Sequence, residues 1–287
     1  MSDGTAGAAG RRRPRPGRAP WPLAVPAALA AAFLLLPLVG LLVRAPWRSI
    51  PSLLTRSDVR EALVLSLETA TVATAVSTVV GVPLAWVLAR QRIPGLALLR
   101  ALVTLPLVLP PVVGGVALLT VLGRNGIVGR YLDDWFGVTI PFTSAAVVLA
   151  EIFVSMPFLV VAVDGALSGA DLRYEEAAAT LGAGRWMVFR RVSVPMIAPA
   201  VASGAVLCWA RALGEFGATI TFAGNFPGTT QTMPLAVYLA LENDPGAAIA
   251  LSLVLLAVSV AVLVGARSAG RWAAVRAGSA AAAARGR

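Results

Sequence analysis

Long apolar segments separated by short charged connectors run through the sequence and limit what it can fold into. A helix needs about 20 mostly apolar residues to cross the hydrocarbon core of a bilayer. Of the 287 residues, 58% are hydrophobic and 13% are charged, whereas an ordinary soluble domain has about 25% charged residues. Six segments are long and apolar enough to span a membrane: residues 21–43, 62–89, 97–122, 144–163, 197–222 and 247–266. The sequence therefore predicts an all-α polytopic membrane protein with six transmembrane helices.

Prolines interrupt the third of these segments. Pro106, Pro110 and Pro111 lie within the stretch LPLVLPPVVGG. A proline removes one backbone hydrogen bond and its ring collides with the preceding turn. We expect a kinked or broken helix here, packed inside a bundle.

Two tails flank the predicted transmembrane domain, which covers residues 21–267. Residues 1–20 consist mainly of Gly, Ala, Pro and Arg without an apolar period, which predicts disorder. The arginines at 11–13 resemble a twin-arginine signal, but the apolar run that follows is too long for a signal peptide. We therefore expect an uncleaved first helix. Residues 268–287 form a C-terminal tail, which we expect to be disordered after Ala277.

The arginines are distributed unequally between the two sides of the predicted bundle. With both termini on one side, 17 of the 24 arginines lie in the tails and loops of that side and six lie on the other. Basic residues favour the cytoplasmic side of a membrane. This distribution predicts cytoplasmic termini, a cytoplasmic loop around residue 174 and an extracytoplasmic loop over 224–245.

The composition excludes several functional classes. The chain has no His and a single Cys, Cys208, so the commonest general base is absent and no metal-ligand spacing occurs. It has no Lys either, so it cannot contain the GxxxxGK[ST] nucleotide-binding pattern. The net charge is +10, and the arginines that carry it lie mainly beside the apolar spans. Orientation of the chain in the bilayer therefore explains them better than nucleic-acid binding does. We expect no catalytic residue, no metal and no cofactor bound by this chain.

The loop between the fourth and fifth spans, about residues 166–195, combines charge with helical composition. Asp171 is placed to cap a short helix, and Glu175 and Glu176 lie in its first turns, where the helix dipole favours carboxylates. Gly182 fits a helix end that requires positive φ, and a second short helix is expected from Arg185. The sequence predicts two short helices at an angle. An interfacial hairpin without a partner is the alternative.

This loop resembles the EAA loop of ABC importer permeases. Glu176, Ala177 and Ala178 precede Gly182 by the family spacing, and the motif ends in Val192-Ser193-Val194-Pro195, where the family has Ile-x-Leu-Pro. The resemblance implies the type I importer permease architecture and a cytoplasmic coupling helix that docks on an ATPase subunit. It assigns ATPase coupling to six residues: Glu175, Glu176, Ala177, Ala178, Gly182 and Pro195.

A second stretch, residues 210–241, narrows the resemblance to the sulfate/molybdate permeases. The core Arg-Ala-x-Gly-Glu-aromatic-Gly is present as Arg211 to Gly217, and the segment NFPGTTQTMPL resembles the molybdate branch. The resemblance covers about residues 61–267. It implies a bacterial plasma-membrane permease for molybdate or tungstate. It also implies partners: a second copy of the chain, two cytoplasmic ATPase subunits that bind ATP, and an extracytoplasmic oxyanion-binding protein.

Several polar residues lie within the predicted spans. Arg211 and Glu215 are four residues apart and share a helix face, so we expect a neutralising pair rather than a substrate site, which would trap the anion. Glu68 and Glu151 are expected near the outer ends of their helices, in reach of interfacial water. The uncharged side chains of Thr219, Thr221 and Asn225 are candidates for a weak oxyanion path, with core packing as the alternative.

Three other functions compete with a molybdate importer. A sulfate or thiosulfate permease shares the same motifs. A stand-alone channel or secondary transporter often carries an internal repeat, which we do not find in this sequence. A polytopic membrane enzyme would need catalytic groups that the composition lacks.

Overall fold

The computed structural model describes the backbone of residues 21–91 and 93–285, and the side chains of those up to 265. The predicted disordered tail at 1–20 lies outside the described residues. The described chain contains helices and no strands. It divides into two units, residues 1–45 and 46–287, and each is considered by itself.

The first unit contains one described helix, α1 (Trp21–Arg44). Its 24 residues are long and apolar enough to cross a membrane, and none of them is buried within the structure. An apolar helix that is exposed on all sides in this way needs lipid or protein around it.

The second unit holds the remaining elements. Its helices are α2 (Ile50–Leu54), α3 (Ser57–Arg90), α4 (Leu96–Thr104), η1 (Leu105–Leu107), α5 (Pro111–Leu122), α6 (Gly129–Phe136), α7 (Ser144–Ser168), α8 (Arg173–Thr180), α9 (Arg185–Val188), η2 (Phe189–Ser193), α10 (Val194–Leu213), α11 (Gly217–Phe222), α12 (Met233–Asn243) and α13 (Pro245–Arg285). Within the described residues, five helices of the whole chain are long and apolar enough to span a membrane, or six if α4–η1 and α5 are counted as one bent span.

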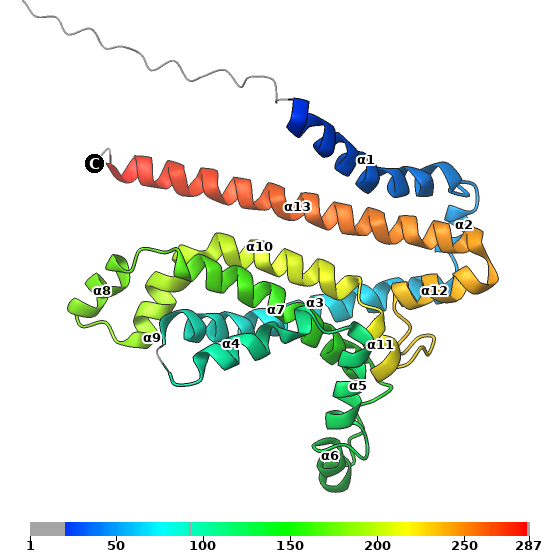
Figure 1. Ribbon diagram of the computed structural model, residues 1–287, viewed down its shortest axis with the longest axis horizontal. Helices are drawn as coiled ribbons and strands as arrows, with labels where there is room; N and C mark the ends of the chain where they lie inside the picture. The colour runs from blue at the N-terminus through cyan, green and yellow to red at the C-terminus, as the bar shows by residue number, and fades with distance from the viewer. Residues whose placement is uncertain (1–20, 92, 286–287) are drawn as a thin grey trace, which may run out of the picture. The chain divides into compact units, whose positions relative to one another are not determined.

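The core lies where α3, α7 and α10 pack against one another (Figure 1). Alanines that are buried lie at these contacts, among them Ala70 and Ala85 on α3 and Ala212 on α10. Small side chains let membrane helices approach closely, because dispersion contacts replace the hydrophobic effect inside lipid. Leu159, Val163 and other aliphatic residues fill the remaining space towards one end of the bundle.

The break predicted in the third apolar segment is present. Helix α4 and the 3-10 turn η1 end at Leu107, α5 begins at Pro111, and the two parts are bent by 117°. Pro110 and Pro111 account for the break, because neither can donate a backbone hydrogen bond and each disfavours helix in the residue before it. Figure 1 shows α5 leaving the direction of the bundle, with α6 at its far end.

The predicted fifth span, 197–222, is wrong as a continuous helix. Helix α10 ends at Leu213, and α11 begins after a three-residue break and packs against α5. Gly115 permits this contact, because a Cβ there would lie 2.8 Å from the carbonyl oxygen of Ala218. The break therefore belongs to a close crossing of α5 and α11 at the end of the bundle that we call the α11 end.

The C-terminal segment also differs from expectation. The disorder predicted after Ala277 is wrong, because α13 continues as one helix to Arg285. The run of alanines in this segment explains the difference, since alanine has the highest helix propensity.

Candidate functional site

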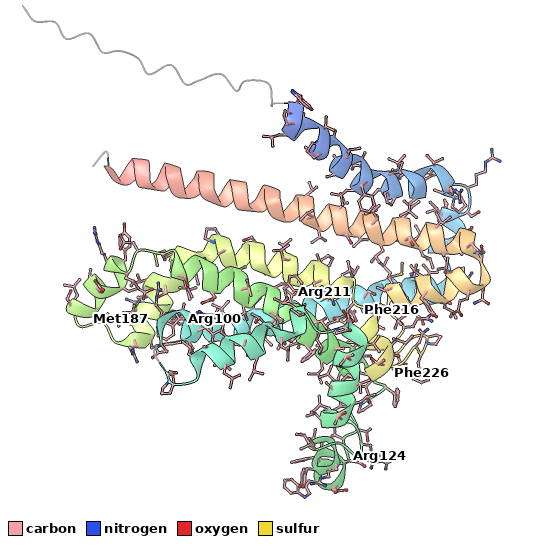
Figure 2. All side chains as sticks on the ribbon, viewed as in Figure 1. Arg100, Arg124, Met187, Arg211, Phe216 and Phe226 are labelled. Carbon is pink, nitrogen blue, oxygen red and sulfur yellow. The ribbon has the colours of Figure 1, made fainter. Side chains whose placement is uncertain are left out.

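The loop singled out in the sequence lies at the opposite end of the bundle, which we call the α8 end. Met187 and Arg100 lie towards this end, whereas Phe216 and Phe226 lie at the α11 end (Figure 2). Helix α8 begins at Arg173. The backbone N–H of Arg173 donates a hydrogen bond of 3.0 Å to the Asp171 carboxylate. The helix cap is thus Leu172 rather than Asp171, although Asp171 still binds an N-terminal amide of the helix.

Helix α8 ends at a glycine with positive φ. Gly182 has φ +84°, its N–H donates to the Ala179 carbonyl, and the Ala183 N–H donates to the Ala178 carbonyl at 3.0 Å. This pair of bonds is the Schellman arrangement, which satisfies the last carbonyls of a helix and needs a residue in the left-handed region. Gly182 thereby fixes the angle between α8 and the chain that follows.

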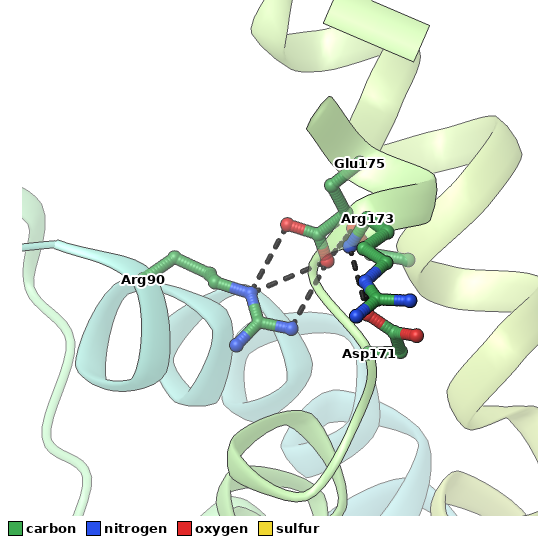
Figure 3. A network of polar contacts seen from close by, with 5 residues as sticks. Arg90, Asp171, Arg173 and Glu175 are labelled. Atoms are coloured by element: carbon green, nitrogen blue, oxygen red, sulfur yellow. Dashed lines mark hydrogen bonds and ion pairs between the residues drawn. The ribbon is translucent and has the colours of Figure 1, made fainter. Parts of the chain in front are cut away.

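Glu175 points towards the bundle. Its carboxylate accepts bonds from Arg90 at 3.1–3.2 Å and from the Ser193 hydroxyl at 3.0 Å (Figure 3). The Arg90 and Glu175 side chains are each 11% exposed, and Ser193 is fully buried. This carboxylate therefore joins α8 to the last turn of α3 and to the turn before α10. Sequence reasoning missed Arg90, because no local pattern connects positions 85 residues apart, and it gave Ser193 no contact with Glu175 although it named Ser193 in the loop motif.

The opposite side of α8 is exposed. Glu176 and Ala177 are exposed and Ala178 is half-buried. Large apolar side chains of the same loop are also exposed: Leu172, Tyr174, Leu181, Trp186 and Met187. We call these five residues together with Glu176 the outer loop surface. Exposed apolar side chains next to polar ones are typical of a protein contact.

The second short helix begins at Arg185 as predicted and is α9, but no break separates it from the fifth span. The chain is helical from Arg185 to Leu213 without interruption, and it passes through a π turn at Phe189–Ser193. Pro195 follows directly and cannot donate the backbone bond that an α-helix needs at that position. The π turn changes the bonding pattern there, so the helix continues past the proline.

Arg211 and Glu215 form an ion pair, with 2.5 Å between Nη1 and Oε2. They do not share one helix as expected, because Glu215 follows the end of α10. Its other oxygen accepts the Ala218 N–H at 2.7 Å, at the start of α11. Glu215 is 1% exposed and Arg211 is 27% exposed, so the carboxylate is the buried member of the pair.

The placement expected for Glu151 is wrong. Glu151 lies on α7 and is 1% exposed, so it does not reach interfacial water. One carboxyl oxygen accepts the Thr69 hydroxyl at 2.9 Å, and the other has no hydrogen-bond partner in the described part of the protein. Glu68, by contrast, is exposed and lines a surface cavity of about 340 Å³ with Arg60 and Glu61.

The three candidate path residues occupy different environments. Thr219 on α11 is fully buried, and among the described residues its hydroxyl has no partner. Thr221 donates to the Gly217 carbonyl of its own helix at 2.8 Å. The Asn225 side chain accepts a bond from Gln231 at 2.9 Å.

A further polar cluster holds α6. Asp133 accepts bonds from Arg124 at 2.8 Å and from the Thr139 hydroxyl at 3.1 Å. The hydrogen bond from Arg124, followed by the one from Thr139, holds the pKa of the Asp133 carboxyl below its ordinary value. This cluster fixes a short helix whose aromatic residues Trp135 and Phe136 are exposed.

Within the described residues, no group of three or more Cys, Asp or Glu side chains is placed to hold a metal ion. The polar contacts described above are ion pairs, helix caps and hydrogen bonds between side chains. They position helices and present one exposed surface at the α8 end.

Comparisons with known proteins agree with this arrangement. Residues 81–270 match the family described as binding-protein-dependent transport system inner membrane component. The molybdenum transport system permease protein ModB of Mycobacterium tuberculosis is 49% identical over 241 residues, which cover 84% of this chain and 91% of that protein. ModB of Escherichia coli K12 is 45% identical, covering 71% and 89%. The sulfate transport system permease protein CysT of the same strain is 38% identical, covering 80% and 84%.

Solved structures of transporters share the fold. A bacterial ABC transporter involved in the import of the acidic polysaccharide alginate aligns with a TM-score of 0.71 and 17% identity, over 88% of this chain and 94% of that one. The same kind of transporter, in complex with an alginate pentasaccharide-bound periplasmic protein, aligns with a TM-score of 0.72 and 19% identity, over 86% and 91%.

Proposed function

The chain belongs to the family of binding-protein-dependent transport system inner membrane components, and from this premise we propose that it is the permease of an ATP-driven molybdate importer. In this proposal it forms the translocation path as a homodimer, with two ATPase subunits on the cytoplasmic side and a binding protein on the other. The chain itself is a transport subunit and carries out no bond chemistry.

The outer loop surface is the observation that carries this proposal. It combines exposed apolar side chains with an exposed carboxylate, Glu176, on a helix that Gly182 and Glu175 hold at a fixed angle. A soluble ATPase needs such a preorganised contact, because a loop ordered only on binding would lose affinity to conformational entropy. The α8 end would then face the cytoplasm, together with both termini, in agreement with the arginine distribution.

Packing in the core supports the homodimer. Fully buried alanines bring α3, α7 and α10 into direct contact, so an anion has no room between them. A path must therefore run along a face of the bundle, and a second copy would enclose it. Native mass measurement of the purified complex should give two permease chains with two ATPases. One permease chain per two ATPases would contradict this.

Molybdate is favoured as the substrate by the relatives. The ModB proteins are 45–49% identical to this chain, whereas the sulfate permease CysT is 38% identical. The test is uptake into vesicles that contain the permease and its ATPase, with the binding protein added outside. We expect ATP-dependent molybdate uptake that a tenfold excess of sulfate does not reduce. Uptake of sulfate with no uptake of molybdate would favour the alternative, a sulfate permease.

A further inference from the structure

The last two turns of α3 contact both arms of the loop that contains α8. The first arm is α8 itself, and the second is the helix that begins at Arg185. Arg90 binds Glu175 on the first arm through three hydrogen bonds of 3.1–3.2 Å. One turn earlier, the ring of Trp86 meets the ring of Phe189 on the second arm edge to face, with 5.6 Å between centroids. The loop therefore rests on α3 at two points, although α3 is not adjacent to it in the sequence.

The Arg90–Glu175 contact is stronger than an ordinary surface ion pair. Both side chains are 11% exposed, so water screens the pair only weakly. Two nitrogens of the guanidinium bind the carboxylate, and such charge-assisted, two-pronged bonds fix orientation as well as distance. The Ser193 hydroxyl binds the same carboxylate from the π turn, so Glu175 connects α3, α8 and the start of α10.

The covalent link to α7 is more loosely held. Residues 169–172 join α7 to α8, and Leu172 in this link is 47% exposed. Among the described residues, Asp171 bonds to the backbone and side chain of Arg173, which is itself 89% exposed (Figure 3). If α8 moved, this link would change its conformation without moving α7. The contacts of Glu175, by contrast, would move α3 and the start of α10 together with α8.

We propose that Glu175 is a positioning residue that transmits movement of the loop to α3 and α10 rather than a residue that contacts the ATPase. This inference rests on the proposed function, because the movement would come from the ATPase bound at the outer loop surface. The two carboxylates then have different roles: Glu176 contacts the ATPase, and Glu175 contacts the bundle. Losing the second contact should uncouple hydrolysis from transport while the ATPase stays bound.

Charge reversal tests this division in the complete importer. Arg90→Glu and Glu175→Arg are compared singly and together in vesicles, with ATPase co-purification, ATP turnover and molybdate uptake measured on each. Each single variant should keep its ATPase but import about tenfold or more less molybdate per ATP, in the range of typical coupling between sites. The double variant restores the opposite charges and should return to within about threefold of the wild type.

Asp164→Asn supplies the matched control. It breaks the Arg100–Asp164 pair at the same end of the bundle, which joins α4 to α7 and does not touch the loop. The molybdate imported per ATP should stay at the wild-type value. Unchanged coupling in both single charge reversals, or an equal loss in the Asp164→Asn control, would overturn the inference.

A measurement on the permease alone keeps the inference testable if charge reversal prevents folding. Spin labels at Ala179 on α8 and Leu98 on α4, two exposed positions, report how firmly the loop is held. The wild type should give a narrow distance distribution, and Glu175→Gln should broaden it. A broad wild-type distribution would overturn the inference. Failure of the ATPase to bind even the wild type would instead contradict the proposed function.

Discussion

Arg211 and Glu215 show how one buried carboxylate can serve two helices. Glu215 neutralises the cation at the end of α10 and accepts the Ala218 N–H at the start of α11. A carboxylate that is 1% exposed without such partners would be costly, because burial removes its hydration. The pair is therefore a structural device of the α10–α11 break, and its loss should be visible in stability before transport is measured.

The stability of the permease should fall by different amounts when Arg211 and Glu215 are removed singly. Arg211→Ala strands the buried carboxylate, and breaking a buried pair in this way costs about 3–5 kcal/mol. Adding Glu215→Gln should recover most of the loss, since the amide is neutral and its oxygen can still accept the Ala218 N–H. The thermal unfolding midpoint of the purified permease in detergent measures this. A double variant, either Arg211→Ala/Glu215→Gln or Arg211→Ala/Glu215→Ala, no more stable than Arg211→Ala would show that the two residues do not act as a pair.

Asp133 gives a prediction about pH. Its folded-state pKa is lowered by Arg124 and Thr139, so the contact stabilises the α6 region above the unfolded-state pKa, about 3.9. This contribution is lost as the pH falls through the lowered folded-state value. Titration of a ¹³C-labelled Asp133 carboxyl should give a midpoint below 3.8, which Arg124→Gln raises. The same midpoint in both proteins would mean that the pair does not persist in solution.

At the scale of elements, apolar segments and prolines predicted most of the fold. The second span was expected at 62–89 and is found at Ser57–Arg90, and the break before Pro111 was expected from its prolines. The end of α10 was not predicted, because Leu213 to Phe216 contain no proline. Glu215 and the packing of α11 on α5 set that end, and these contacts are tertiary. The short helices of the loop and the turn at Gly182 were predicted from local motifs, whereas the anchor of the loop on Arg90 was not.

The crossing of α5 and α11 depends on Gly115. A Cβ there would meet the Thr221 hydroxyl and lie 2.8 Å from the Ala218 carbonyl oxygen, so Gly115→Ala must push the two helices apart. Overpacking of this kind costs about 1–3 kcal/mol. Gly165→Ala is the matched control, since nothing lies within 4 Å of a Cβ at that helical position. Thermal unfolding should show a loss in the first variant and none in the second. Equal midpoints would refute the close crossing.

At the scale of the whole molecule, the proposed function depends on the outer loop surface at the α8 end of an apolar bundle. The chain has no residue pattern for nucleotide chemistry, and its family is that of transport-system membrane components. We therefore propose that a separate ATPase supplies the energy and contacts the outer loop surface. Glu176 is an exposed carboxylate of that surface, and Gly182 sets the angle at which α8 presents it.

Coupling in reconstituted vesicles tests this account most directly. Glu176→Lys and Gly182→Val are compared with Gly184→Val, whose φ of −66° and open surroundings accept valine without strain. Valine at Gly182 must adopt φ +84°, which costs roughly 1 kcal/mol or more. We predict that the first two variants insert and dimerise normally but bind less ATPase or import less molybdate per ATP, while Gly184→Val behaves as the wild type. Normal ATPase binding and coupling in both Glu176→Lys and Gly182→Val would contradict the assignment of this loop to the ATPase.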